Sequence, residues 1–348
     1  MEYPKTDAVS MKRRRWGRLG PEYVDKEESF VKNDGMAFLV FKQLVEMLFL
    51  IGLSYGVSRF RHYGDKEAQY LSFLLLYVIA PAIVIDPYNI PFDPERFRVT
   101  LVMLLFSFVG MMVLVVLSLF IPKKHTDASL SAIDKMGTVY SNCGYIGIPI
   151  VQAAMGREAT FFIVPYLLMF NMIFWIHGQY VMTGKLSFKA VITKPMIIGS
   201  LFAFLLFVSP WTLPPVIGEA VATLSTLNMP LSMFLLGILF ANFKRSSDKA
   251  GFPIGRMVMV FILRLVVSPL LMILCFLPLR GVLSTDAMLK TLALIIVIVS
   301  ACPCGVNITS AAVLFKKNSS YAGLLVMGTT ILSVATIPVF THLAEVVL

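Results

Sequence analysis

The sequence predicts an all-α polytopic membrane protein, and three observations support this fold class. Of the 348 residues, 57% are hydrophobic and only 14% are charged, whereas soluble domains contain about 25% charged residues. The mean hydropathy is +0.80. After residue 36, apolar stretches follow one another, each close to the roughly 20 residues that cross a bilayer as a helix. This composition excludes a soluble enzyme, a nucleic-acid-binding domain and a disordered chain.

A polar tail precedes the apolar region. Residues 1–35 contain a basic cluster, KRRRWGR at 12–18, and then an acidic stretch, EYVDKEE at 22–28. The tail has no apolar centre, so we expect no cleavable signal peptide. We interpret it as a solvated extension whose basic cluster could touch lipid headgroups.

Ten apolar stretches form the rest of the chain, with short loops between them and no intervening soluble domain. They lie near 37–60, 68–86, 99–121, 133–155, 159–183, 195–209, 215–243, 253–278, 286–315 and 319–347. Residues 36–185 hold the first five and residues 190–348 the last five. Pro81 in the second stretch and Pro230 in the seventh occupy similar places in these two halves.

The fourth and ninth stretches are poor continuous helices. The fourth contains SNCGYIGIPIVQAAMG (141–156), and the ninth contains SACPCGVNITSAAVLF (300–315), with Pro303, Gly305 and Asn307 at its centre. Proline removes a backbone donor and clashes with the preceding turn, and glycine costs helix stability. Unpaired backbone groups are costly in hydrocarbon, so such breaks persist only inside protein or beside a water-filled cavity. We therefore expect both breaks to be internal.

Each break lies in the fourth stretch of its half. A repeat with an odd number of helices inserts its second copy upside down. The sequence therefore predicts ten transmembrane helices in two inverted five-helix repeats, with broken helices four and nine crossing each other. Interrupted segments at corresponding places in two halves indicate a transporter's binding site. The alternative is a pair of ordinary kinks, since glycine and proline are common in membrane helices.

The distribution of Lys and Arg predicts the orientation. These residues concentrate in and beside the loops that follow the odd-numbered stretches, and cytoplasmic loops carry such an excess. We expect an integral protein of the plasma (inner) membrane with both termini outside, although the basic tail argues for the opposite orientation.

Short motifs accompany the two breaks. The first break has the pattern Asn-x-Gly-Tyr-x-Gly-x-Pro, formed by Asn142, Gly144, Tyr145, Gly147 and Pro149. The second has Pro-x-x-x-Asn, formed by Pro303 and Asn307. The seventh stretch contains Pro230, Leu231 and Gly237, and the tenth contains TTILSVATIP (329–338).

These motifs resemble the auxin efflux carrier family, which includes plant auxin carriers and bacterial carriers of malate or malonate. Tyr145 replaces the family's phenylalanine. The resemblance implies a ten-helix inverted-repeat fold similar to sodium/proton antiporters and bile-acid symporters. It further implies that spans one, two, six and seven form a scaffold that dimerises, while spans three to five and eight to ten move. The short central loop (184–194) favours a small carboxylate over auxin as substrate.

The predicted binding site lies where the broken helices cross. Half-helix N-termini suit a carboxylate, and carboxamides can donate to one. Arg264 lies within the eighth stretch, and an ionisable group at that depth is a functional hypothesis by default. The candidate substrate-binding residues are Asn142, Cys143, Gly144, Tyr145, Gly147, Pro149, Arg264, Pro303, Cys304, Gly305 and Asn307. Structural roles remain open for the asparagines, and also for Arg264, which could pair with a carbonyl or a helix end.

The predicted function is secondary transport of a small organic anion by alternating access with an elevator-like motion. One alternative is a sodium-coupled symporter of the bile-acid type, although no acidic pair is visible near the breaks to hold the ion. Another is a soft-metal carrier using Cys302 and Cys304, since thiolates select copper(I). A third is a sensor that binds ligand without flux. We see no enzyme motif, and we expect no cofactor and no nucleic-acid partner.

Overall fold

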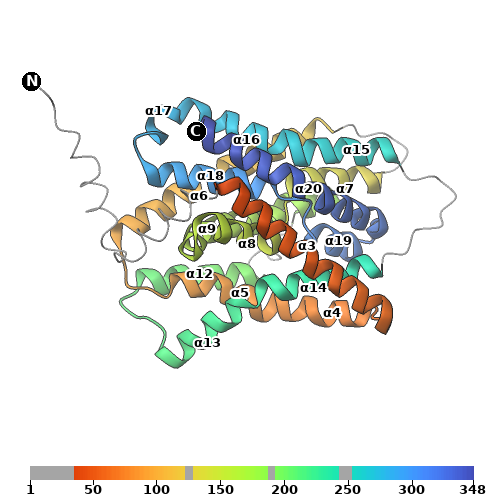
Figure 1. The fold of residues 1–348 in the computed structure, drawn as a ribbon, viewed down its shortest axis with the longest axis horizontal. Helices are drawn as coiled ribbons and strands as arrows, with labels where there is room; N and C mark the ends of the chain where they lie inside the picture. Colours follow the sequence, from red (N-terminus) through yellow and green to blue (C-terminus); the bar gives the residue numbers. More distant parts are fainter. Residues whose placement is uncertain (1–34, 122–127, 187–192, 243–252) are drawn as a thin grey trace, which may run out of the picture.

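The computed structural model describes residues 35–121, 128–186, 193–242 and 253–348, which form packed helices (Figure 1). Within these ranges there is no strand, and the one β-type pairing is an isolated antiparallel bridge between Ser141 and Cys304. The predictions for the polar tail lie outside the described residues. The predicted all-helical class is confirmed.

Helix occupies all ten predicted stretches, and several helices are joined through a π-helical or 3-10 turn. The first half contains α3 (Met36–Arg61), α4 (Asp65–Leu74), η1 (Leu75–Ile79), α5 (Ala80–Ile85), η2 (Asp86–Tyr88), α6 (Pro94–Leu119), α7 (Ala128–Val139), η3 (Cys143–Gly147), α8 (Ile148–Met155), η4 (Arg157–Ala159), α9 (Thr160–Ile173), η5 (Phe174–Gly178) and α10 (Gln179–Thr183). The second half contains α12 (Pro195–Val208), α13 (Pro215–Thr226), α14 (Asn228–Ala241), α15 (Ile254–Ile262), η6 (Leu263–Val267), α16 (Ser268–Phe276), η7 (Leu277–Leu279), α17 (Arg280–Leu283), α18 (Ala287–Ala301), α19 (Asn307–Leu314) and α20 (Ser319–Val347).

Seven helical segments of the described chain are long and apolar enough to cross a membrane. They are Met36–Arg61, Lys66–Tyr88, Pro94–Leu119, Arg157–Thr183, Pro215–Ala241, Ile254–Leu283 and Ser319–Val347. Three shorter apolar helices accompany them, Cys143–Met155, Pro195–Val208 and Ala287–Ala301. Two of these short helices flank the predicted breaks, since a break divides one apolar stretch into two half-length helices.

Local capping fixes where two of the helices begin. The Asp93 carboxylate accepts hydrogen bonds from the backbone N–H groups of Glu95 (2.7 Å) and Arg96 (3.3 Å) at the start of α6. The Asp286 carboxylate likewise accepts hydrogen bonds from the backbone N–H groups of Met288 and Leu289 at the start of α18. These side chains satisfy amide donors that no helical carbonyl can reach.

The outer surface is strongly apolar. Large side chains point away from the protein along α3, where Phe49 is 71% and Phe60 81% exposed, and others line α6 and α12. Contiguous apolar surface of this extent is rare on soluble monomers. It matches the environment of a lipid bilayer.

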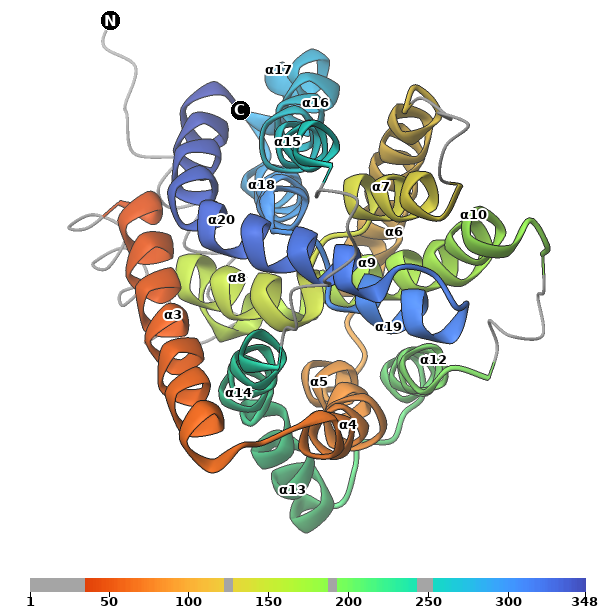
Figure 2. The ribbon, with the colours of Figure 1, turned by 90° about the vertical axis from the view of Figure 1, so that its right-hand side faces the viewer.

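The helices pack as two groups (Figure 2). One group consists of α3, α4, α5, α12, α13 and α14. In this group α14 packs on α3, while both α12 and α13 pack on α5. The other contains α6 to α10 and α15 to α20, in which α6 packs on α9 and α18 packs on both α16 and α20. The groups meet where α3 contacts α8 and α20. We call them the first and the second helix group.

Gly237 permits the closest approach inside the first helix group. A Cβ atom at Gly237 would lie 2.5 Å from the Ser54 Cβ and 2.6 Å from the Ile51 carbonyl oxygen. The Ser54 hydroxyl donates to the Phe234 carbonyl (2.7 Å) across the same contact. Small residues allow membrane helices to approach in this way, so the glycine of the span-seven motif serves the α3–α14 contact.

Candidate functional site

The two predicted breaks meet in space. Helix α7 ends at Val139, and its chain continues without helix through Tyr140–Asn142. The Asn142 N–H donates to the Pro303 carbonyl (2.8 Å), and the Gly305 N–H donates to the Tyr140 carbonyl (3.0 Å). The breaks thus form a short antiparallel pair. We call residues 140–142 and 302–306 together the helix-break junction.

The sequence predicts that the second half-helices begin near Pro149 and Val306, and α8 does begin at Ile148 and α19 at Asn307. The π-helical turn η3, which precedes α8 from Cys143, was not predicted. The Asn142 carbonyl accepts from the N–H groups of both Ile146 (3.0 Å) and Gly147 (3.1 Å). A wide π turn can therefore precede the proline, which then lies in the first turn of α8, where its missing donor is tolerated.

The first helix group supplies donors to this π turn. The Asn228 side chain of α14 donates to the Gly144 carbonyl (3.0 Å), and the Ser232 hydroxyl contacts the Tyr145 carbonyl at 3.5 Å. Pro149 cannot donate to the Tyr145 carbonyl four residues earlier, so that oxygen is free to receive a bond from another helix. The motif around the first break therefore docks on α14.

Every carbonyl in the last turn of α7 has a donor. Met136 O accepts from the Tyr140 N–H (2.9 Å), and Gly137 O accepts from the Cys304 thiol (3.3 Å). Arg264 Nη1 donates to Thr138 O (3.0 Å) and Val139 O (3.1 Å). Helix C-termini leave such carbonyls without intrahelical partners, and this end is capped by groups from the second half of the chain.

Arg264 also caps the other helix that ends at the junction. It is fully buried and lies in η6. Its Nε donates to the Cys302 carbonyl (3.0 Å), and Nη2 donates to the Ser300 carbonyl at the end of α18. The guanidinium carries five N–H groups, and its donors are directed at backbone oxygens of two helices. These contacts support the structural role that the sequence left open for Arg264, and its pairing with a substrate carboxylate stays a prediction.

The opposite ends of the broken helices present unpaired donors. In the described chain, no hydrogen-bond acceptor contacts the backbone N–H groups of Tyr145 in η3, or those of Val306 and Asn307 at the start of α19, while the N–H groups of Cys143 and Gly144 face only the Cys143 sulfur. The Asn142 side chain is 3% exposed, and its Nδ2 has no partner either. Buried donors normally have partners, so these groups mark a place for an acceptor.

Two glycines at the junction have different surroundings. A Cβ atom at Gly144 would meet nothing within 4 Å, whereas one at Gly305 would lie 2.9 Å from the Ser141 carbonyl oxygen. Gly305 therefore permits the two breaks to pair. Gly144 instead leaves open space at the start of η3, which is the arrangement that lets a ligand approach a backbone.

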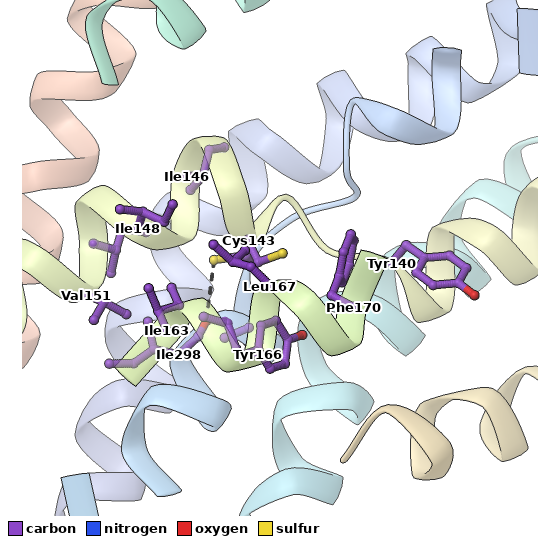
Figure 3. Packing of buried hydrophobic residues seen from close by; sticks show 14 of the residues in the cluster. Tyr140, Cys143, Ile146, Ile148, Val151, Ile163, Tyr166, Leu167, Phe170 and Ile298 are labelled. Atoms are coloured by element: carbon purple, nitrogen blue, oxygen red, sulfur yellow. Dashed lines mark hydrogen bonds between the residues drawn. The ribbon is translucent and has the colours of Figure 1, made fainter. Parts of the chain in front are cut away.

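The cysteines of the junction act as backbone caps. The Cys302 thiol donates to Ile298 O within its own helix (3.4 Å), while the Cys304 thiol donates to α7. Figure 3 shows Cys143 among apolar side chains that include Leu167 and Ile298, and the carbonyl of Ile298 is the one that accepts from Cys302. No group of three or more His, Cys, Asp or Glu residues suited to a metal ion occurs in the described part of the chain. This arrangement does not support the soft-metal alternative.

Tyr140 anchors the first break to α9 and η5. Its ring stacks edge-on against Phe170, with 5.6 Å between the ring centroids (Figure 3). Its hydroxyl lies 3.1 Å from the Ile173 carbonyl and 2.8 Å from His177 Nδ1. These contacts hold the residue whose carbonyl accepts from Gly305.

Sequence reasoning did not identify a buried ion pair close to the junction. Asp134 of α7 is fully buried, lies 2.5 Å from Arg256 of α15, and accepts a hydrogen bond from the Tyr321 hydroxyl of α20 (2.7 Å). These residues are far apart in the chain and share no motif. The one available signal was Asp134 itself, an acidic residue within an apolar stretch, which is a functional hypothesis by default.

A second ionic contact joins the two helix groups. Arg157 of η4 lies 3.1 Å from Asp86 of η2, and the Ser225 hydroxyl of α13 donates to the same carboxylate (2.7 Å). The Arg157 side chain is 60% exposed. Exposed ion pairs contribute little stability, so this contact can break at low cost.

A small apolar pocket also lies between the groups. It is bordered by α3, α14, α20 and η3, and lined by Leu44, Met47, Leu48, Ile51, Ile146, Met233, Thr330, Ser333 and Val334. The two hydroxyls donate to carbonyls of their own helix. The pocket therefore presents hydrocarbon, and it reaches the π turn through Ile146.

Comparison with known proteins gives a family for the second half. Residues 179–341 match the family model described as membrane transport protein. No curated protein matches the chain significantly. The matched segment extends from α10 into α20 and includes Arg264 and the second break, but not the first break. With the seven membrane-length helices of its described residues, the protein is a multi-pass membrane transporter. The match over residues 179–341 is to the auxin efflux carrier family, the same family that the motifs resemble.

Proposed function

We propose that this transporter moves a small organic anion, a carboxylate, by alternating access. The observation that supports this proposal is the set of unpaired donors in and beside the helix-break junction. The N–H groups of Tyr145, Val306 and Asn307 and the Asn142 Nδ2 group lack acceptors in the described chain. A carboxylate accepts several such bonds, and the partial positive charge of helix N-termini favours an anion.

The surroundings of the proposed site are aliphatic. The apolar pocket adjoins η3 through Ile146, next to Tyr145, and its volume is about 10 Å³, which fits about one water-sized group. A carbon chain could therefore enter this region only when the two helix groups move apart.

The two helix groups support a rocking or elevator-like motion. We propose that the first group is the scaffold and the second the moving unit. We also propose that residues 36–185 and 190–348, which each contribute helices to both groups, are two inverted five-helix repeats. The Arg157–Asp86–Ser225 contact joins the groups through a partly exposed ion pair, which can open during a cycle. We further propose a homodimer through scaffold helices, in the plasma (inner) membrane, with both termini outside.

Binding to purified protein tests the substrate class. A thermal-shift screen would compare monocarboxylates, dicarboxylates and indole acids with chloride and sulfate. We expect a carboxylate to stabilise the wild-type protein, and uptake of that compound into proteoliposomes to follow. Stabilisation by thiol-seeking metals and by no carboxylate would contradict the proposal. Binding without flux would make the protein a sensor.

Asn142→Ala tests the site. The variant removes an unpaired amide donor, so its folding should be unaffected, while binding of the carboxylate found in the screen should weaken. The loss of one donor to a charged acceptor is worth about 1–3 kcal/mol, which is roughly a 5- to 150-fold change in affinity. Asn307→Ala should act similarly, and the double variant should be non-additive if both residues touch one ligand.

Two further variants separate binding from folding. Asn171→Ala is the matched control, because this asparagine of α9 donates to a carbonyl of its own helix (2.8 Å) and should not affect binding. Gly144→Ala should fold normally, since its new methyl group meets no atom within 4 Å, but it should hinder a ligand at the adjacent N–H. Unchanged affinity in both Asn142→Ala and Gly144→Ala would refute the proposed site.

A further inference from the structure

The C-terminal ends of the broken helices form a potential cation site. Helix C-termini carry partial negative charge. In transporters with discontinuous helices, unwound backbone carbonyls and half-helix C-terminal ends coordinate the coupling sodium ion or proton. Here α7 and α18 end side by side at the helix-break junction, and both direct carbonyl oxygens to one place. The fold that the motifs resemble therefore implies a sodium ion at this point.

Arg264 already occupies that place. Its guanidinium donates to Thr138 O and Val139 O of α7 and to Ser300 O and Cys302 O at the end of α18. Arginine is always charged in proteins. The same oxygens that a sodium ion would use are engaged with a covalently attached cation, and the side chain is fully buried.

The acidic ligand that a sodium site would use is engaged as well. Among the described residues, Asp134 is the buried carboxylate. Its oxygens face Arg256 of α15 and the Tyr321 hydroxyl of α20. A hard cation prefers carboxylate and carbonyl oxygens, and in this arrangement both types have protein partners. The residues present do not fit a bound sodium ion.

We propose that Arg264 is a built-in counter-ion, which replaces a coupling metal cation at the junction of the broken helices. The guanidinium neutralises both helix C-termini and fixes how the two breaks pair. The transporter therefore needs no sodium or potassium ion to assemble its site. This inference rests on the carbonyl contacts and is independent of the anion proposed above.

Thermal unfolding of the purified, ligand-free protein tests the inference. The wild-type protein would be compared in sodium, potassium and choline chloride at equal ionic strength. We expect the same unfolding temperature in all three salts. A specific upward shift in sodium chloride would overturn the proposal, because a ligand that binds only the folded state raises its stability.

Replacement of Arg264 should create the missing cation site. Arg264→Ala leaves four carbonyls without their donor, so we expect a lower unfolding temperature that sodium or low concentrations of guanidinium partly restore and choline does not. Arg264→Lys retains the charge, so it should be less destabilised and insensitive to sodium. Arg157→Ala is the control, since that arginine pairs with a carboxylate at the surface and its loss should produce no cation dependence.

The outcomes separate this proposal from the proposed function. A folded Arg264→Ala protein that responds equally to sodium, guanidinium and choline would refute the counter-ion role, whatever the substrate is. If Arg264→Ala does not fold, a sodium response in wild type or Arg264→Lys would still refute it. Carboxylate binding can fail in the screen above without changing any of these results.

Discussion

Substitution of Gly237 by alanine should destabilise the first helix group. The new Cβ would lie 2.5 Å from the Ser54 Cβ and 2.6 Å from the Ile51 carbonyl oxygen. Both atoms belong to α3, and one of them is backbone, so a side-chain rotation cannot relieve the clash. Helix α14 must move away from α3 by about 1 Å to restore ordinary van der Waals separation.

The magnitude follows from two contributions. Overpacking of a close contact costs about 1–3 kcal/mol. The separation also stretches the hydrogen bond from Ser54 to the Phe234 carbonyl, now 2.7 Å, whose loss costs about 1 kcal/mol. The gain in helix propensity from glycine to alanine offsets at most about 1 kcal/mol. We therefore expect a net loss of about 1–3 kcal/mol.

The assay is thermal or denaturant unfolding of the purified protein in detergent, with Gly52→Ala as the matched control. Gly52 lies in α3, and a Cβ there would meet nothing within 4 Å, so this change should be neutral or slightly stabilising. Equal stability of the two alanine variants would show that α3 and α14 do not pack as closely as described.

Three other predictions concern the buried pair, the cysteines and the orientation. Asp134→Ala should cost about 3–5 kcal/mol of unfolding free energy, since it leaves Arg256 without its carboxylate, whereas Tyr321→Phe should cost about 1.5–3 kcal/mol for one bond to a charged group; equal losses in an unfolding assay would contradict this ranking. Cys302→Ser and Cys304→Ser should leave uptake nearly unchanged, because a hydroxyl can still cap the same carbonyls; loss of uptake with either would point to metal transport. A cysteine introduced at Lys189, outside the described residues, should be labelled only from the cytoplasmic side, and labelling from outside in intact cells would reverse the predicted orientation.

Local signals explain why the sequence predicted much of the fold. Apolar length alone located the helical stretches, because the hydrocarbon core sets how many residues a helix needs. The breaks were also predictable, since Pro303 and the glycines after Asn142 act on the backbone at their own positions. The start of helix at Cys143 was not, because it depends on a π turn whose carbonyls bond to Asn228 and Ser232 of a distant helix.

The role of Arg264 shows the limit of sequence reasoning. A buried arginine needs hydrogen-bond acceptors or an opposite charge. From the sequence alone, a carboxylate ligand and a set of backbone carbonyls are equally suitable partners. The sequence by itself determined the membrane class, the helical stretches, the two breaks and the family motifs. The tertiary structure decided which groups meet at the breaks: Arg264 bonds to carbonyls 125 and 126 residues away in one helix and 36 and 38 residues away in another. Carbonyl oxygens belong to every residue and leave no mark in the sequence, so only the packing of the helices reveals which of them need a donor.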